Sequence, residues 1–283
     1  MPEGTDVMAG LKSDRELFLR TVSGVVLVGI IVSGINFGGI FWQLISCVIA
    51  LGSMSEYYKL VSKFKDCRIS PGIGYIFALM VLISAMRGAR PDLIAMLLTV
   101  GTFVIFLIEI FRKQLTKGNE SNAIANSGAI LSGVIYIAVP WVSMILLREY
   151  SFGRQVLMTL FCCTWGCDVF AYVGGRLYGR SKLCAYVSPG KTWVGFIWGI
   201  IGSLVVNAFM LYFYRLPAYP LMLIGIICGT AGQAGDLAES LIKREAGEKD
   251  SGRIIPGHGG ILDRFDSILI NGTLTCLILE ILL

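Results

Sequence analysis

WVGFIWGIIGSLVVNAFMLYFY, residues Trp193 to Tyr214, contains no charged side chain. A helix needs about 20 mostly apolar residues to cross the hydrocarbon core of a bilayer. A strand of a membrane barrel would be about 10 residues long, with alternating polarity. The segment therefore predicts a transmembrane helix.

Apolar stretches of this kind recur along the whole chain. Hydrophobic residues make up 55% of the 283 residues and charged residues only 15%, and the mean hydropathy is +0.73. These values are typical of an integral membrane protein rather than a soluble domain. We expect an all-α, polytopic helical bundle with about nine transmembrane helices, at residues 21–42, 43–62, 71–86, 92–111, 124–147, 156–175, 193–214, 219–242 and 265–283.

The distribution of positive charge predicts the orientation. All but five of the 24 Lys and Arg residues fall on the segments that share a side with the N-terminus; the exceptions are Arg87, Arg90, Arg148, Arg154 and Arg215. Cytoplasmic loops carry an excess of Lys and Arg, so we expect a cytoplasmic N-terminus and an external C-terminus. The compact chain, without an evident targeting segment, favours a multi-pass protein of a bacterial inner (plasma) membrane.

Polar content divides the chain into regions. We expect a cytoplasmic segment at 1–20, a transmembrane scaffold at 21–150, and a catalytic region at 151–283 with cytoplasmic loops 174–192 and 243–264. The net charge of +5 suits anionic lipid headgroups or a polyphosphate substrate. Nucleic acid is disfavoured as a partner, because the basic residues are split among short membrane loops.

In the first half, few polar residues call for a functional explanation. Glu56, Tyr57 and Tyr58 lie near the end of an apolar segment, where an interface belt is the simplest interpretation. Gly128, Gly133 and Pro140 are expected to adjust helix packing or bend a helix. The eight cysteines fall mostly within apolar segments and are interpreted as packing residues.

In the second half, Asp168 lies inside an apolar run. Inserting Asp near the centre of a span costs about 2.5 to 3.5 kcal/mol, which favours a functional role over the alternative, a carboxylate hydrogen-bonded to Thr164 and Tyr172. The following loop is rich in glycine and basic residues, from Gly174 to Thr192. It is suited to cradling phosphate, although a solvated basic loop would have the same composition.

Two further groups of acids flank the 243–264 loop. Asp236, Glu239, Ser240 and Lys243 share one helix face by their spacing, and Asp263 and Asp266 begin the last apolar segment. Asp236, Asp263 and Asp266 can converge on hard divalent cations, which prefer oxygen ligands. Surface ion pairs with Lys243, Arg244 and Arg264 are the alternative.

His258 is the only histidine and is surrounded by glycines. Glycine permits positive φ angles and close approach to a ligand, so this turn can sit against phosphate. His258 can equally serve as a hydrogen-bonding strut. A zinc site is disfavoured, because one histidine and cysteines within apolar segments do not supply its ligands.

The segment Ser240 to Asp266 resembles the family motif of phosphatidate cytidylyltransferases, also called CDP-diacylglycerol synthases. The motif positions are filled by Ser240, Lys243-Arg244, Lys249-Asp250, Pro256, His258-Gly259-Gly260, Asp263-Arg264 and Asp266. Upstream, Asp168-Val-Phe-Ala171-Tyr172, Gly179-Arg180-Ser181-Lys182 and Ser188-Pro189-Gly190-Lys191-Thr192-Trp193 also resemble the family's loops. The resemblance is close over Trp165 to Asp266. One position departs from the family pattern: Val194 stands where the family usually has Glu.

This resemblance implies transfer of the cytidylyl group of CTP to phosphatidic acid, giving CDP-diacylglycerol and pyrophosphate. It implies dependence on Mg²⁺, with a second cation such as K⁺ left open, and a homodimer. The implied catalytic residues are Asp236, Lys243, Asp263 and Asp266; the implied metal ligands are Asp236, Asp263 and Asp266. The implied substrate-binding residues are Asp168, Arg180, Lys182, Ser188, Lys191, Thr192, Ser240, Arg244, Lys249, Asp250, His258, Gly259, Gly260 and Arg264.

Two other functions remain as alternatives. A transporter or channel would use Asp168, Asp236 and Glu239 to line an ion or proton path, although the sequence shows no internal repeat. A CTP-dependent lipid kinase would transfer the γ-phosphate to an alcohol and release CDP. A purely structural membrane protein would have no use for so many acids within apolar segments.

Overall fold

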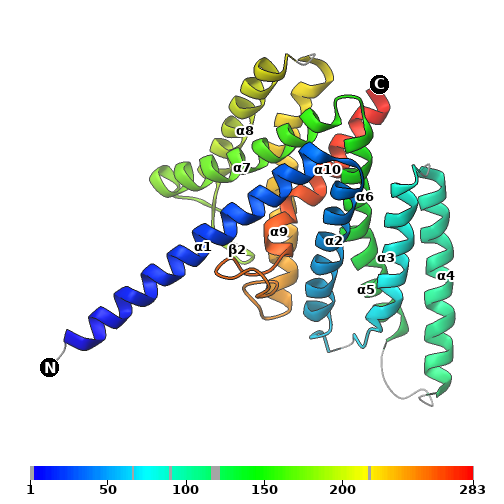
Figure 1. The fold of residues 1–283 in the computed structure, drawn as a ribbon. Coiled ribbons are helices and arrows are strands. Elements are labelled where there is room, and N and C mark those ends of the chain that lie inside the picture. The colour runs from blue at the N-terminus through cyan, green and yellow to red at the C-terminus, as the bar shows by residue number, and fades with distance from the viewer. Residues whose placement is uncertain (1–2, 66, 89–90, 116–121, 216–217, 283) are drawn as a thin grey trace.

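The computed structural model describes residues 3–65, 67–88, 91–115, 122–215 and 218–282 (Figure 1). Its elements are α1 (Glu3–Phe37), α2 (Gly39–Val61), α3 (Pro71–Met86), α4 (Pro91–Leu115), α5 (Ala123–Gly133), the π-helix η1 (Val134–Ala138), α6 (Val139–Glu149), α7 (Gly153–Tyr178), β1 (Lys182–Cys184), β2 (Ser188–Thr192), α8 (Trp193–Tyr214), α9 (Ala218–Glu245) and α10 (Leu262–Leu282). The predicted fold class, an all-α polytopic membrane protein, is confirmed. In the described part of the chain, eight helical segments are long and apolar enough to cross a membrane, and α3 is a shorter apolar helix.

The first two helices are separated at Gly38, earlier than the predicted boundary between residues 42 and 43. Gly38 has a positive φ of 63°, a conformation that glycine adopts without the steric cost of a side chain. The Arg148 Nε donates to the carbonyl of Ile35 at 2.8 Å. This places a cation at the C-terminal end of α1, where exposed carbonyls favour positive charge.

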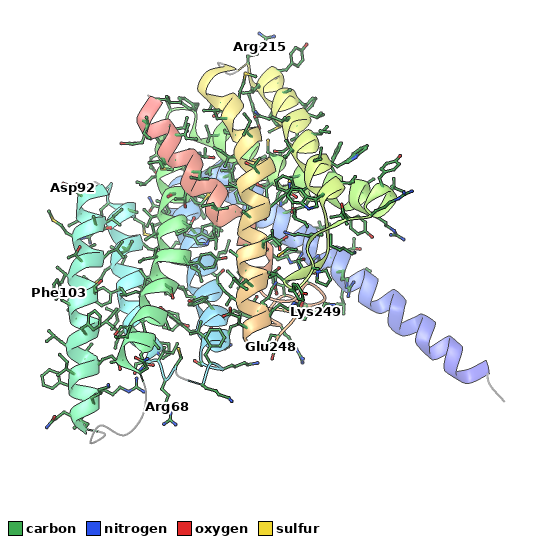
Figure 2. All side chains as sticks on the ribbon, turned by 180° about the vertical axis from the view of Figure 1, so that it is seen from behind. Arg68, Asp92, Phe103, Arg215, Glu248 and Lys249 are labelled. Carbon is green, nitrogen blue, oxygen red and sulfur yellow. The ribbon has the colours of Figure 1, made fainter. Side chains whose placement is uncertain are left out.

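Aromatic side chains occupy the centre of the bundle. Trp42, Trp141, Phe161 and Phe265 are buried, and the Trp42 Nε1 donates to the carbonyl of Met144 at 2.9 Å. Phe103 on α4 is 68% exposed and points away from the bundle (Figure 2). Large apolar side chains that face outward in this way are expected where a protein meets lipid.

The predicted interface belt at Glu56, Tyr57 and Tyr58 is wrong. The three residues are 1%, 6% and 2% exposed. The Tyr58 hydroxyl donates to the carbonyl of Ile130 at 2.9 Å, and the Tyr57 hydroxyl lies 2.6 Å from Ser132 Oγ. They are buried because their polar atoms find partners inside the bundle, which sequence position alone does not reveal.

The predicted irregularity around Gly133 and Pro140 takes the form of η1. Proline has no N–H, so Pro140 cannot make the regular bond to the carbonyl four residues earlier. The Val139 N–H instead bonds to the carbonyl of Val134, five residues back. The wider turn lies between α5 and α6, in the middle of one membrane-spanning segment.

The loop expected at 174–192 begins later than predicted. Helix α7 continues to Tyr178, and β1 and β2 then form a short antiparallel hairpin. The segment between α9 and α10 lies near the same end of the bundle as this hairpin (Figure 1). Glu248, Lys249 and Arg68 lie toward that end, whereas Asp92 and Arg215 lie at the other (Figure 2).

Candidate active site

A polar cleft of about 730 Å³ opens between α7, β2, α9 and α10. It is lined by many of the predicted site residues: Asp168, Lys182, Lys191, Thr192, Asp236, Lys243, Asp250, Asp263, Arg264 and Asp266. The other predicted residues lie outside its lining: Arg180, Ser188, Ser240, Arg244, Lys249, His258, Gly259 and Gly260. The structure thus brings together acids from three helices and basic residues from the hairpin and the last two helices.

Three acids form a compact cluster at this cleft, and two of them, Asp236 and Asp266, line it. Asp236 and Glu239 come from successive turns of α9, and Asp266 comes from α10; one carboxylate oxygen of each lies within 4.8 Å of the other two. Glu239 is fully buried, and its charged partner among the described residues is Lys243. Three carboxylates that can each direct an oxygen toward one point offer the ligands that a hard cation prefers, so this donor set fits such an ion.

Asp236 has two further partners. Lys191 on β2 places its Nζ 2.7 Å from the Asp236 Oδ2 and also donates to the carbonyl of Gln233 at 3.2 Å. Ser240 donates to the Asp236 Oδ1 at 3.3 Å. Ser240 therefore acts on the cleft through Asp236, although it does not line the cleft itself.

Asp263 is surrounded by hydrogen-bond donors. Its Oδ1 accepts from the Lys243 Nζ at 2.7 Å, and its Oδ2 accepts from the backbone amides of Ser251 and Gly260 at 2.9 and 2.8 Å. Lys243 is 8% exposed and also pairs with Glu239. Lys243 thus links Asp263 to the acid cluster, in place of the surface ion pair considered from sequence. The role of Asp263 as a metal ligand stays a prediction.

Glu56 holds the loop that carries the Asp263 partners. Its Oε1 accepts from the amide of Ile261 at 3.0 Å. Its Oε2 accepts from the amide of Leu262 at 2.8 Å and from Ser251 Oγ at 3.0 Å. A carboxylate satisfies the unpaired amides at the start of a helix, so Glu56 on α2 fixes the start of α10, which positions Asp263 and Asp266.

The basic side of the cleft is organised by helix capping and backbone contacts. Thr192 is the N-cap of α8, and its Oγ1 accepts from the amide of Gly195 at 3.1 Å; this cap fixes the junction between β2, which carries Lys191, and α8. Arg244 donates to the carbonyls of Val187 and Glu248, at 3.2 and 3.0 Å. Arg244 therefore joins the hairpin to the loop after α9.

His258 lies against α1 as a strut. Its Nδ1 is 2.7 Å from Ser23 Oγ, which is 2.9 Å from the carbonyl of Pro256. Partial burial and the positive charges of Arg264 and Arg20 lower the pKa of His258. These contacts favour the role of His258 as a hydrogen-bonding strut. Its role in substrate binding stays a prediction.

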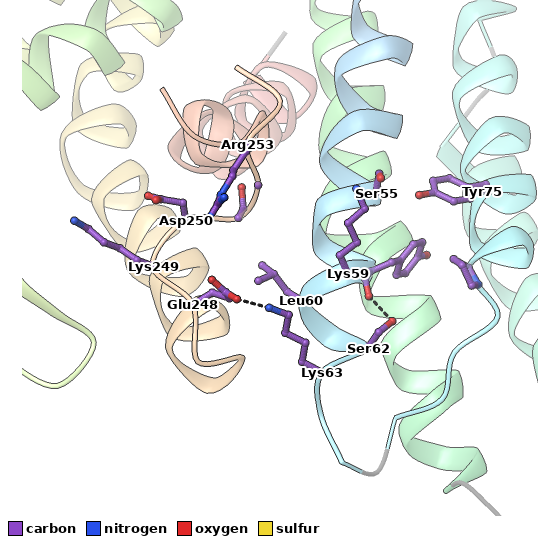
Figure 3. Close-up of a pocket in the computed structure, with 14 residues that line it drawn as sticks. Ser55, Lys59, Leu60, Ser62, Lys63, Tyr75, Glu248, Lys249, Asp250 and Arg253 are labelled. Carbon is purple, nitrogen blue, oxygen red and sulfur yellow. Dashed lines mark hydrogen bonds and ion pairs between the residues drawn. The ribbon is translucent and has the colours of Figure 1, made fainter. Parts of the chain in front are cut away.

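A second pocket of about 880 Å³ lies beside the cleft, between α2 and residues 248–253 (Figure 3). Lys63, in the turn that follows α2, forms an ion pair with Glu248 across it. The hydrogen bond between them lowers the pKa of Glu248. Lys249 lines this pocket, whereas Asp250 lines both cavities. The segment 248–253 is therefore a wall between the two.

Several residues that line or support the cleft were not predicted from the sequence. Glu239 was placed on the correct helix face but not among the site residues. Gln233, Tyr172 and Arg176 also line the cleft. The helical spacing from Asp236 was the available signal for Glu239. For Glu56 no local pattern exists, since its partners lie in the segment between α9 and α10 and at the start of α10.

Comparison with known proteins gives a consistent result. Residues 18–282 match a family described as the cytidylyltransferase family. A protein of Staphylococcus haemolyticus named phosphatidate cytidylyltransferase is 34% identical over 253 residues, 89% of this chain and 94% of the relative. Proteins of the same name from Synechocystis sp. and Rickettsia prowazekii are 30% and 28% identical, over 93% and 92% of this chain and 97% and 90% of the relatives.

Proposed function

The chain belongs to the cytidylyltransferase family, and from this membership we propose that it transfers the cytidylyl group of CTP to phosphatidic acid, giving CDP-diacylglycerol and pyrophosphate. The observation that carries the proposal is the acid cluster of Asp236, Glu239 and Asp266, because Asp236 and Asp266 line a cleft that also contains basic side chains. The names of the relatives supply the identity of the substrates. The transporter and the lipid kinase have no comparable support.

The chemistry places modest demands on the protein. A phosphate oxygen of phosphatidic acid forms a bond to the α-phosphorus of CTP, and the bond from that phosphorus to the oxygen bridging to the β-phosphate breaks. The attacking oxygen is already anionic at neutral pH, so no strong general base is needed. Catalysis then consists of positioning the two phosphates and neutralising charge on them.

The basic residues of the cleft supply part of that charge. Lys182 and Lys191 line it from the hairpin, and Arg264 lines it from α10. Preorganised donors of this kind stabilise developing charge in a site that excludes water. We assign Lys191 and Arg264 to the phosphates of CTP or the lipid, and Lys243 to holding Asp263 and Glu239 while presenting its remaining proton to substrate.

The acid cluster fits a divalent cation. Asp236, Glu239 and Asp266 would hold Mg²⁺, and Asp263 keeps a free lone pair on Oδ1 that agrees with its predicted place in the ligand set. A bound Mg²⁺ would supply charge neutralisation for the phosphate oxygens. A second cation such as K⁺ is compatible with the number of carboxylate oxygens present.

We further propose a homodimer in a bacterial inner membrane, with the cleft facing the cytoplasm. The distribution of Lys and Arg supports this orientation, and the matched relatives are bacterial. CTP would then enter from the cytoplasm while the diacyl substrate stays in the bilayer.

The direct test uses detergent-purified protein with phosphatidic acid, Mg²⁺ and CTP labelled with ³²P at the α- or the γ-phosphate. We expect the α-label to enter the organic phase, the γ-label to leave as pyrophosphate, and EDTA to stop both. Transfer of the γ-label to lipid would instead establish a kinase. No label in any lipid would overturn the proposed function.

A further inference from the structure

An apolar groove of about 470 Å³ adjoins the polar cleft. It lies between α5, η1 and α6 on one side and α9 and α10 on the other, and its walls carry Leu131, Ile135, Leu269 and Ile270. Asp266 lines both this groove and the cleft. The two cavities therefore meet at a residue of the acid cluster.

The groove follows α10 from the acid cluster. Asp266, Leu269, Ile270 and Thr273 line it from successive turns of α10. At 1.5 Å per residue, Asp266 and Thr273 are separated by roughly 10 Å along the helix. The opposite wall extends from Gly128 through η1 to Pro140. The cavity is thus a long apolar path with a charged end.

One polar group in the groove has no partner among the described residues. The Tyr136 hydroxyl, on η1, is buried and makes no hydrogen bond there. The other hydroxyls are engaged: Ser132 with Tyr57 and the carbonyl of Ala129, and Thr273 with the carbonyl of Leu269. An unpaired buried hydroxyl costs free energy unless a ligand supplies the partner. An ester carbonyl is an acceptor of the kind that Tyr136 lacks.

We propose that this groove is an acyl-chain subsite, which holds one fatty acyl chain of phosphatidic acid while the phosphate lies in the polar cleft. The proposal rests on the proposed function. Its basis is that the groove and the cleft meet at Asp266. A ligand that occupies both cavities must join a phosphate to a long hydrocarbon, with a carbonyl near the junction. Tyr136 donates to the ester carbonyl, and Leu131, Ile135, Leu269 and Ile270 cover the chain.

Gly128 gives a means of filling the groove without disturbing the fold. A Cβ built at Gly128 has nothing within 4 Å, and Leu has a higher helix propensity than Gly. Gly29 on α1 is the matched control, because its Cβ also meets nothing within 4 Å and it lies outside the groove. The variants are Gly128→Leu and Gly29→Leu.

The experiment measures KM and kcat with dihexanoyl, dioctanoyl and dioleoyl phosphatidic acid in mixed micelles. Each methylene withdrawn from an apolar site lowers affinity about fourfold. We expect Gly128→Leu to raise KM for the dioleoyl lipid by about tenfold or more, to change KM for the dihexanoyl lipid much less, and to leave kcat with CTP near wild type. Gly29→Leu should match wild type at every length.

A rise in KM that is equal at all chain lengths, or no rise in KM, would overturn the proposed subsite. A second measurement does not depend on turnover: phosphatidic acid carrying a diazirine on its acyl chain should label peptides containing residues 128–140 or 266–273, and Gly128→Leu should reduce the labelling. Label confined to other helices, or competed equally by phosphatidylcholine, would also overturn it. Specific labelling by a protein that shows no turnover would support the subsite and contradict the proposed function.

Discussion

Glu56 and the start of α10 are separated by 205 positions at Ile261 and 206 at Leu262, yet the carboxylate accepts both amides. The same side chain accepts from Ser251 Oγ, so one residue fixes both ends of the segment that surrounds His258. Glu56 is buried and does not line the polar cleft. Its effect on the chemistry is therefore indirect, through the position of Asp263 and Asp266.

Glu56→Gln should destabilise the protein. The amide replaces one acceptor oxygen with a donor that faces another N–H or O–H, which leaves buried donors unpaired at a cost of about 1–3 kcal/mol. Thermal unfolding in detergent should show a lower Tm. Glu248→Gln removes only the exposed pair with Lys63 and serves as the control, with a Tm close to wild type. Equal Tm values for both variants and wild type would contradict the role of Glu56.

At the residue scale, the sequence predicted those parts of the site that are local. Asp236, Lys243, Asp263 and Asp266 line the cleft, since helical spacing and the motif both place them at the ends of apolar segments. Glu56 and Glu239 were not among the predicted site residues. The partners of Glu56 lie far away in the sequence, so only the packed structure reveals its role. Glu239 had a signal in its helical spacing from Asp236, but it carried no motif signal.

At the scale of elements, the segment between α9 and α10 is packed too closely for a side chain at Gly260. A Cβ there would contact Ser251 Oγ and Glu56 Oε2. The amide of Gly260 also donates to Asp263. The glycines of the motif thus serve close packing against Glu56 and Asp263, and their proposed contact with substrate stays a prediction.

Gly260→Ala should lower both stability and activity, because either Glu56 or the loop must move to admit the methyl group. We expect a loss of stability of about 1–3 kcal/mol and a fall in kcat/KM, measured by thermal unfolding and by the lipid-labelling assay. Gly72→Ala on α3 is the control, since its Cβ meets nothing within 4 Å. Wild-type behaviour of Gly260→Ala would contradict the packing described for this loop.

The contact between α1 and the His258 turn should depend on pH. The pKa of His258 is lowered in the folded protein, whereas an unfolded histidine titrates near about 6.5. Protonation therefore favours the unfolded state, and stability should fall as pH drops below that value. The Tm should decrease from pH 7.5 to 5.5, and His258→Gln should show a smaller decrease. An equal decrease in both proteins would assign the pH dependence to other groups.

At the scale of the whole molecule, hydropathy was sufficient for the fold class, because the bilayer demands long apolar helices. The sequence did not predict the break at Gly38 or the continuation of α7 to Tyr178. The first was missed because two apolar segments run together, and the second because glycine and arginine in a helix resemble a loop in composition. The packing of α2 against the 246–261 segment depends on tertiary contacts that no single segment encodes.

The predicted orientation can be tested with fusions at the C-terminus. A cytoplasmic N-terminus and an external C-terminus, as the Lys and Arg distribution predicts, should give active alkaline phosphatase and non-fluorescent GFP when each is fused after residue 283. Fluorescent GFP with inactive phosphatase would reverse the orientation and place the cleft on the external side, away from CTP.

We place the catalytic centre of cytidylyl transfer at the acids where α9 and α10 meet. The most direct measurement is the initial rate of lipid labelling from α-labelled CTP by Asp266→Asn, beside Glu280→Gln. Glu280 lies at the other end of α10 and accepts from the Tyr150 hydroxyl. We predict that Asp266→Asn lowers the rate about 100-fold or more, because it removes a charge from the acid cluster, with unchanged Tm, and that Glu280→Gln labels lipid near the wild-type rate. A folded Asp266→Asn protein that labels lipid at the wild-type rate would show that these acids are not the catalytic centre.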